Sequence, residues 1–226
     1  MDLVGKETLE VMKEARWYNQ WLFTMIEPYL GKEILEIGAG TGNFTRILSK
    51  IGEVTVIDIE ERYIKDLKKN KNISSGFGDI EEGRYFFHAK KFDSIVCLNV
   101  LEHISNDFKA LKNAFKLLKE GGTLILLVPA HQILFSNFDK TLGHFRRYTT
   151  GELTQKLESV GFVGVTNRYL NWWAAVGWFV FLKLTGWRKM PGSEVGIFNY
   201  LGRLFLWPEK FVKLPFGLSV LVVAKK

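Results

Sequence analysis

Cysteine is almost absent from the sequence, since Cys97 is the one cysteine among 226 residues. A single cysteine cannot form an intrachain disulfide, which excludes a disulfide-stabilised secreted domain. Cys97 lies in an apolar run, where a small core side chain is expected instead of a catalytic thiol. The residues before Arg16 also lack the continuous apolar run of a secretory signal. These absences predict a cytoplasmic protein.

Long apolar segments of the kind that cross a membrane are also lacking. The aromatic run 169–182 carries no charge but has only 14 residues, whereas a spanning helix needs about 20. The composition is otherwise ordinary, with 47% hydrophobic and 24% charged residues. Such a chain of 226 residues is expected to form one globular domain with a single sizeable core.

A glycine-rich turn follows the first clear apolar run. Residues 34–37 read as a buried strand, and Gly38, Gly40 and Gly42 come directly after it. Glycine lets the backbone bend sharply and approach a ligand closely, and a following helix offers free N–H groups. The pattern predicts a nucleotide-type binding site.

The acidic residue that follows indicates which kind of nucleotide. The dinucleotide fingerprint needs a third glycine where this chain has Asn43. A second apolar run, 54–57, ends in Asp58. Its carboxylate can accept hydrogen bonds from both hydroxyls of a ribose. A domain that binds NAD is the less favoured alternative.

These segments resemble motif I and the acidic loop of the class I S-adenosylmethionine-dependent methyltransferases. The resemblance continues in order through Gly78-Asp79-Ile80, through 92–97 and through 118–124, so that it covers about 34–128. It implies an α/β fold: a Rossmann-like, seven-stranded, mostly parallel sheet with helices on both faces and an antiparallel strand seven. Within the single domain 1–226 we expect an N-terminal cap helix (1–30), a cofactor-binding core (31–168), an aromatic basic insertion between strands six and seven (169–214) and a last strand (215–226).

The resemblance also implies the cofactor, S-adenosyl-L-methionine, and the residues that hold it. These are Glu36, Gly38, Ala39, Gly40, Gly42, Asp58, Ile59, Asp79, Ile80 and Asn99. Glu102 and His103 come next and can be read as an acid–base pair, but we prefer a role in shaping the loop. No metal site is predicted.

The loop after the expected fifth strand, residues 123–128, carries the candidate catalytic and substrate-binding residues. His131 and His144 are the candidate bases, because histidine exchanges a proton near neutral pH. Arg146, Arg147 and Tyr148 would bind an acidic or phosphorylated acceptor, and Tyr18 would reach it from the N-terminal helix. Alternatively, the arginines merely anchor the loop. The Gly-His-Phe-Arg-Arg-Tyr string resembles a type 11/12-like subgroup associated with glycan or lipid-related chemistry.

The positive charge of the chain is concentrated in its last third. Residues 160–226 hold nine Lys and Arg against two acidic residues, and five of the seven tryptophans. Basic and aromatic residues together favour contact with an anionic membrane surface. We therefore expect residues 169–213 to bind the inner face of the membrane peripherally. A hydrophobic lid or a homodimer contact is the alternative.

The leading interpretation is a methyltransferase whose acceptor is a hydrophobic, lipid-linked or glycan-type small molecule. An RNA-modifying enzyme is an alternative, but residues 99–102 lack the Pro-Pro-aromatic signature of enzymes that methylate base amino groups. No nucleic acid partner is therefore expected. A non-catalytic, membrane-associated cofactor binder is the third interpretation.

Overall fold

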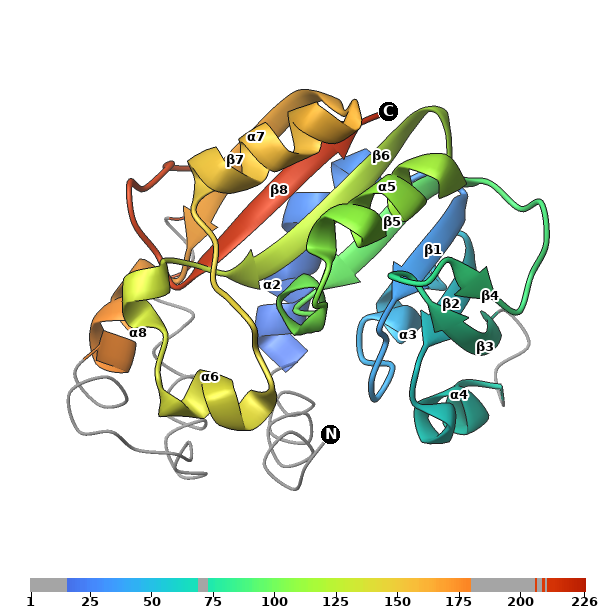
Figure 1. Ribbon diagram of the computed structural model, residues 1–226, viewed down its shortest axis with the longest axis horizontal. Coiled ribbons are helices and arrows are strands. Elements are labelled where there is room, and N and C mark those ends of the chain that lie inside the picture. Colours follow the sequence, from blue (N-terminus) through green and yellow to red (C-terminus); the bar gives the residue numbers. More distant parts are fainter. Residues whose placement is uncertain (1–15, 69–72, 180–205, 207–208, 210) are drawn as a thin grey trace.

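The computed structural model describes residues 16–68, 73–179, 206, 209 and 211–226 (Figure 1). Its centre is an eight-stranded sheet in the order β4-β3-β2-β1-β5-β6-β8-β7. The strands are β1 Glu33–Ile37, β2 Glu53–Asp58, β3 Ile73–Asp79, β4 Arg84–Tyr85, β5 Phe92–Leu98, β6 Leu118–Pro129, β7 Val163–Leu170 and β8 Ser219–Lys225. β8 runs antiparallel to both β6 and β7. The mostly parallel sheet with an antiparallel last strand is therefore confirmed.

Helices cover both faces of the sheet, as predicted. α5 and α7 lie on one face, and α2 lies on the other (Figure 1). The helices are α2 Arg16–Ile26, α3 Thr45–Leu48, α4 Glu61–Leu67, α5 Asp107–Leu117, α6 Asn137–Leu142, α7 Thr150–Val160 and α8 Trp172–Trp178. Leu111 and Leu157 belong to the apolar cluster beneath α5 and α7, and Leu22 and Ile26 to the cluster beneath α2.

The strand register brings the segments that build the site to one edge of the sheet. Pro129 at the end of β6 is paired with Ser219, the first residue of β8. Ser219 is also paired with Leu170, the last residue of β7. The segments that follow β6 and β7 therefore leave from the edge where β1, β2 and β5 end, which is where open α/β sheets bind ligands.

Local signals in the sequence explain several element boundaries. The pattern Thr149-x-x-Glu152 predicts a capping box, and the two residues form one at the start of α7, in which each side chain bonds to the backbone N–H of the other residue. α7 ends at Gly161, whose φ of 114° suits glycine. Pro28 lies in a 3-10 turn, Glu27–Tyr29, directly after α2.

Two details of the predicted fold were wrong. The sheet has eight strands because Arg84–Tyr85 pairs with Gly78 and Asp79, and a two-residue strand is too short to show alternation. The spacing of Phe108, Leu111, Phe115 and Leu118 predicts a helix that ends at Gly121-Gly122, whereas α5 ends at Leu117. The next residue, Leu118, is already paired with Phe92 in the sheet, and it is fully buried there.

The predicted insertion begins later than expected, because β7 continues to Leu170 before α8 starts. Much of 169–214 and residues 1–15 of the predicted cap helix lie outside the described residues. Within the described part of the chain, no helix has the length and apolarity needed to span a membrane.

Candidate active site

The turn after β1 is a tightly packed backbone cradle. Gly38 has a φ of 72° and Gly42 a φ of 73°, in the left-handed region that favours glycine. A Cβ on Gly38 would lie 2.4 Å from Val100 Cγ2, and one on Gly42 would lie 2.4 Å from Leu67 Cδ2. A side chain at Gly38 or Gly42 would therefore clash with its neighbour. Ala39 and Gly40, in the same turn, are partly exposed to solvent at the edge of the sheet.

Asp58 faces this turn from the end of β2. Its carboxylate accepts hydrogen bonds from the N–H groups of Gly40, at 3.2 Å, and Glu60, at 2.9 Å. Burial raises the pKa of Asp58, and these backbone bonds oppose the rise. The adjacent Ile59 is 66% exposed and offers an apolar surface beside the carboxylate. A carboxylate held in this way can accept further bonds from a ribose.

Glu36 is a buried acid next to the glycine turn. Its Oε2 has no hydrogen-bond partner among the residues that the structure describes. Burial raises the pKa of Glu36 to about 7, although a bond from Thr45 lowers it. A buried carboxylate oxygen with no partner is unfavourable unless a ligand supplies a donor.

The remaining predicted cofactor residues lie at the ends of β3 and β5. Asn99 follows β5, is exposed and has a φ of 54°. One carboxylate oxygen of Asp79, Oδ1, already accepts a hydrogen bond from the Glu82 N–H at 2.9 Å. Ile80 is buried in the core. The glycine cradle, the Asp58 carboxylate and the unused Glu36 oxygen together fit S-adenosylmethionine.

His131 lies at the end of β6 in an aromatic stack. Its ring is 4.6 Å from that of Tyr169 and 4.4 Å from that of Phe216, with nearly parallel planes. Burial, and then the nearby Arg147 charge, lower the pKa of His131. Its Nε2 has no hydrogen-bond partner in the described structure. A neutral imidazole with an unused nitrogen is suited to accept a proton.

Arg147 and Tyr148 are buried, which corrects the prediction that they bind the substrate. Arg147 makes a bidentate pair with Asp139, at 2.8 and 3.0 Å. The Tyr148 hydroxyl donates to Asp107 at 2.9 Å, and burial raises its pKa. Both side chains anchor the loop, as in the alternative interpretation.

Arg146 and Tyr18 are also engaged within the protein. Arg146 pairs with Asp107 at 3.0 Å and donates to the Ser105 carbonyl at 2.7 Å. Tyr18 is buried, and its hydroxyl accepts a bond from the Asn171 amide at 3.0 Å. Burial raises the pKa of Tyr18 to about 12. Tyr18 thus links α2 to the start of α8, and its predicted contact with the substrate needs correction as well.

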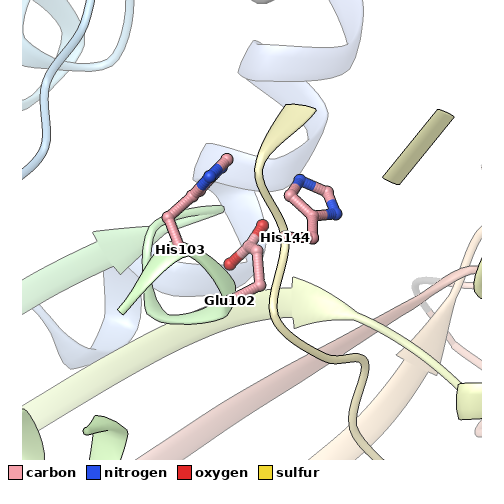
Figure 2. A group of neighbouring side chains, drawn as sticks. All are labelled: Glu102, His103 and His144. Atoms are coloured by element: carbon pink, nitrogen blue, oxygen red, sulfur yellow. The ribbon is translucent and has the colours of Figure 1, made fainter. Parts of the chain in front are cut away.

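His144, the second candidate base, belongs to a different cluster from His131. Its Nδ1 is 2.9 Å from Asp139 Oδ1, and its ring meets the His103 ring edge-on at 4.6 Å. Figure 2 shows the Glu102 carboxylate between the two imidazoles. Burial raises the pKa of Glu102 to about 8, and burial and then His144 lower that of His103 to about 4. Glu102 and His103 are not among the predicted site residues, although their place after β5 was a usable signal.

Comparison with known families and structures agrees with this geometry. A family model described as a methyltransferase domain matches residues 15–167, which is more than half of the chain. The chain belongs to the class I S-adenosylmethionine-dependent methyltransferases. A SAM-dependent methyltransferase from Archaeoglobus fulgidus has a TM-score of 0.64 at 19% identity, over 93% of this chain and 94% of its own. Phosphoethanolamine N-methyltransferase 2 from Haemonchus contortus, in complex with S-adenosyl-L-methionine, has a TM-score of 0.62 at 17% identity, over 92% of this chain and 52% of its own. At these identities the likeness shows a shared methyltransferase fold.

Curated relatives of this methyltransferase differ in the acceptors for which they are named. A demethylmenaquinone methyltransferase of Tropheryma whipplei is 31% identical over 54% of this chain and 52% of its own. A ubiquinone biosynthesis O-methyltransferase of Coxiella burnetii is 37% identical over 50% and 51%. A tRNA U34 carboxymethyltransferase of Campylobacter hominis is 25% identical over 74% and 58%. The chain spans about half the length of these curated relatives.

Proposed function

We propose that this methyltransferase transfers the methyl group of S-adenosylmethionine to a hydrophobic, lipid-linked or glycan-type small molecule at a membrane surface. The proposal is carried by the apolar side chains at the ligand edge of the sheet. Among the residues that the structure describes, eight of the thirteen exposed large hydrophobic ones are in the segments after β6 and β7 and before β8: Ile133, Phe145, Trp172, Val176, Phe179, Phe211, Val212 and Phe216. Such a concentration marks a binding surface for an apolar partner.

The chemistry requires few protein groups. When bound, the cofactor supplies an electrophilic methyl group, so the protein mainly positions the acceptor and excludes water. His131 is the group that would take a proton from an acceptor hydroxyl, because its ring is neutral at pH 7 and its Nε2 is unused within the described structure. Tyr169 and Phe216 hold the ring from either side and add apolar surface next to it.

The names of two relatives support an apolar acceptor, since both refer to quinone biosynthesis. The positive charge of the last third would favour the anionic inner face of the membrane. RNA is the competing acceptor, because the Campylobacter hominis relative is named for tRNA and aligns with more of this chain than the other two do.

The test is transfer from radiolabelled S-adenosylmethionine to three separate fractions: membrane lipids, total RNA and aqueous metabolites. We expect label in the lipid fraction, and we expect Asp58→Ala to reduce it strongly when the cofactor is limiting. Glu53→Ala is the matched control, because Glu53 is exposed at the opposite end of the same strand. Label in RNA alone would replace the proposed acceptor by RNA. Cofactor binding without any labelled product would support the non-catalytic interpretation.

A further inference from the structure

The cluster of Glu102, His103 and His144 has no part in the function proposed above. The candidate ligand atoms of the three side chains all lie within 4.8 Å of one another. Glu102 and His103 belong to the 3-10 turn Leu101–His103 after β5, and His144 belongs to the loop after α6. Two loops far apart in the sequence therefore meet here, as Figure 2 shows. We propose that this cluster binds a divalent transition-metal ion, with zinc as the best match.

The donor set suits zinc in number and kind. Two imidazole nitrogens and one carboxylate oxygen are the ligands of a common type of catalytic zinc site. Bonds of about 2.1 Å place tetrahedral ligands about 3.4 Å apart, so the 4.8 Å limit in this structure would need to close by about 1.4 Å. Side-chain rotation can supply a movement of that size.

One histidine of the cluster has a partner that fixes the orientation of its ring. The Nδ1 of His144 bonds to Asp139, which leaves Nε2 as the ligand atom. In metal sites, the second ring nitrogen of a ligating histidine almost always has such a carboxylate or carbonyl partner. His144 is therefore already held as a ligating histidine would be.

Glu102 has a buried carboxylate oxygen without a hydrogen-bond partner in the described structure. Glu102 is 1% exposed, and its Oε2 makes no hydrogen bond with any described residue. Arg147 lies near, but its charge is balanced by the bidentate pair with Asp139. A cation would satisfy the Glu102 oxygen and compensate its charge.

The proposed metal site differs from the sequence prediction of no metal, because Glu102-His103 alone is a common pair with no ligand spacing. His144 joins the pair only through tertiary contacts, such as the bond from the Phe145 N–H to the Glu102 carbonyl at 2.8 Å. Three protein ligands leave a tetrahedral zinc ion one open position. An oxygen atom of the methyl acceptor would bind at that open position. This use of the site rests on the proposed function, whereas metal binding itself does not.

The test is metal uptake by the full-length protein without any acceptor. The chelator-stripped protein is dialysed against limiting zinc, and the bound metal is measured by mass spectrometry. Cobalt is then substituted, and its visible spectrum reports four-coordinate nitrogen and oxygen ligands. We expect one equivalent of zinc in the wild type, and loss of that equivalent in His103→Gln and in His144→Gln. His88→Gln is the control, because His88 is exposed and outside the cluster.

S-adenosylhomocysteine binding and circular dichroism check that each variant is folded. If a histidine variant does not fold, Glu102→Gln is tested in its place. A wild-type protein that takes up less than one equivalent overturns the proposal. Uptake that survives in both cluster variants, or is lost in His88→Gln, also overturns it. Stoichiometric zinc in a protein without methyl transfer would leave the metal site standing and remove the proposed function. Methyl transfer by a protein that binds no zinc would support the proposed function and overturn the metal site.

Discussion

The imidazole of His131 stacks on the ring of Phe216, with centroids 4.4 Å apart and planes inclined by 18°. The stack joins the end of β6 to the segment just before β8, so an aromatic surface lies against the candidate base. If His131 accepts the acceptor's proton, His131→Gln should lower kcat about 100-fold or more. The affinity for S-adenosylhomocysteine should stay unchanged, because the cofactor residues lie on other loops. Steady-state kinetics measures kcat, and calorimetry measures the affinity for S-adenosylhomocysteine. His88→Gln is the control for both. An unchanged kcat would remove His131 from the chemistry.

Asp58→Ala tests the cofactor site. The substitution removes the carboxylate that accepts bonds from the Gly40 and Glu60 N–H groups and faces the ribose position. Hydrogen bonds to a charged group contribute about 1.5–3 kcal/mol, so the affinity for S-adenosylhomocysteine should fall roughly 10- to 100-fold. Calorimetric titration measures this, and Glu53→Ala should bind as the wild type does. Equal affinity in Asp58→Ala would mean that the ribose is held elsewhere.

Glu36 should make the stability of the ligand-free protein depend on pH. Its pKa in the folded state is raised from 4.5 to about 7, mainly by burial. The unfolded chain therefore releases this proton earlier, and the free energy of unfolding falls as the pH rises from 4.5 to 7. The fall should be roughly 3 kcal/mol, at 1.36 kcal/mol per pKa unit.

Glu36→Gln should remove this fall, because glutamine does not ionise. Urea denaturation at pH 4.5 and pH 8 measures the difference between wild type and variant. Glu53→Gln, with its exposed side chain, should keep the wild-type dependence. A Glu36→Gln variant with the wild-type pH dependence would contradict the raised pKa.

Arg147→Met should destabilise the protein by about 3–5 kcal/mol, because it leaves the Asp139 carboxylate buried without its main partner. Asp139 is fully buried, and the Arg147 side chain is 1% exposed. Thermal and chemical denaturation measure the loss. Arg146→Met is the comparison: Arg146 is partly exposed, and its partner Asp107 also pairs with Lys156. Its loss should be about 1 kcal/mol or less. Equal losses in the two variants would argue against a special role for the buried pair.

Peripheral membrane contact can be tested with two similarly exposed valines. Val212 is 54% exposed near the ligand edge, and Val163 is 58% exposed at the first residue of β7, the opposite end of the sheet. Val212→Ser, combined with Phe211→Ser, should reduce binding to anionic phospholipid vesicles in a sedimentation assay. Val163→Ser should leave it unchanged. If vesicles do not bind the wild type at all, the exposed apolar surface belongs to the acceptor or to another protein chain.

The parts of the site that sequence could predict are those set by local chain geometry. The glycine turn, Asp58 and the Thr149–Glu152 capping box each depend on neighbouring residues, and each is where the pattern placed it. The sequence could not decide whether the arginines bind the substrate or anchor the loop, because tertiary packing determines the partner of Arg147. Asp139 lies in another element, and no spacing rule links the two. For the same reason the histidine cluster was missed.

The position of β8 between β6 and β7 constrains the order in which the sheet can form during synthesis. β7 is translated before β8, yet β8 is the strand that pairs with it and joins it to β6. Until residues 219–225 leave the ribosome, β6 and β7 each present an open edge to the solvent. A nascent chain stalled before Ser219 would therefore display the open edge of β6 and an unpaired β7, and such open strand edges are targets for chaperones and sites of aggregation.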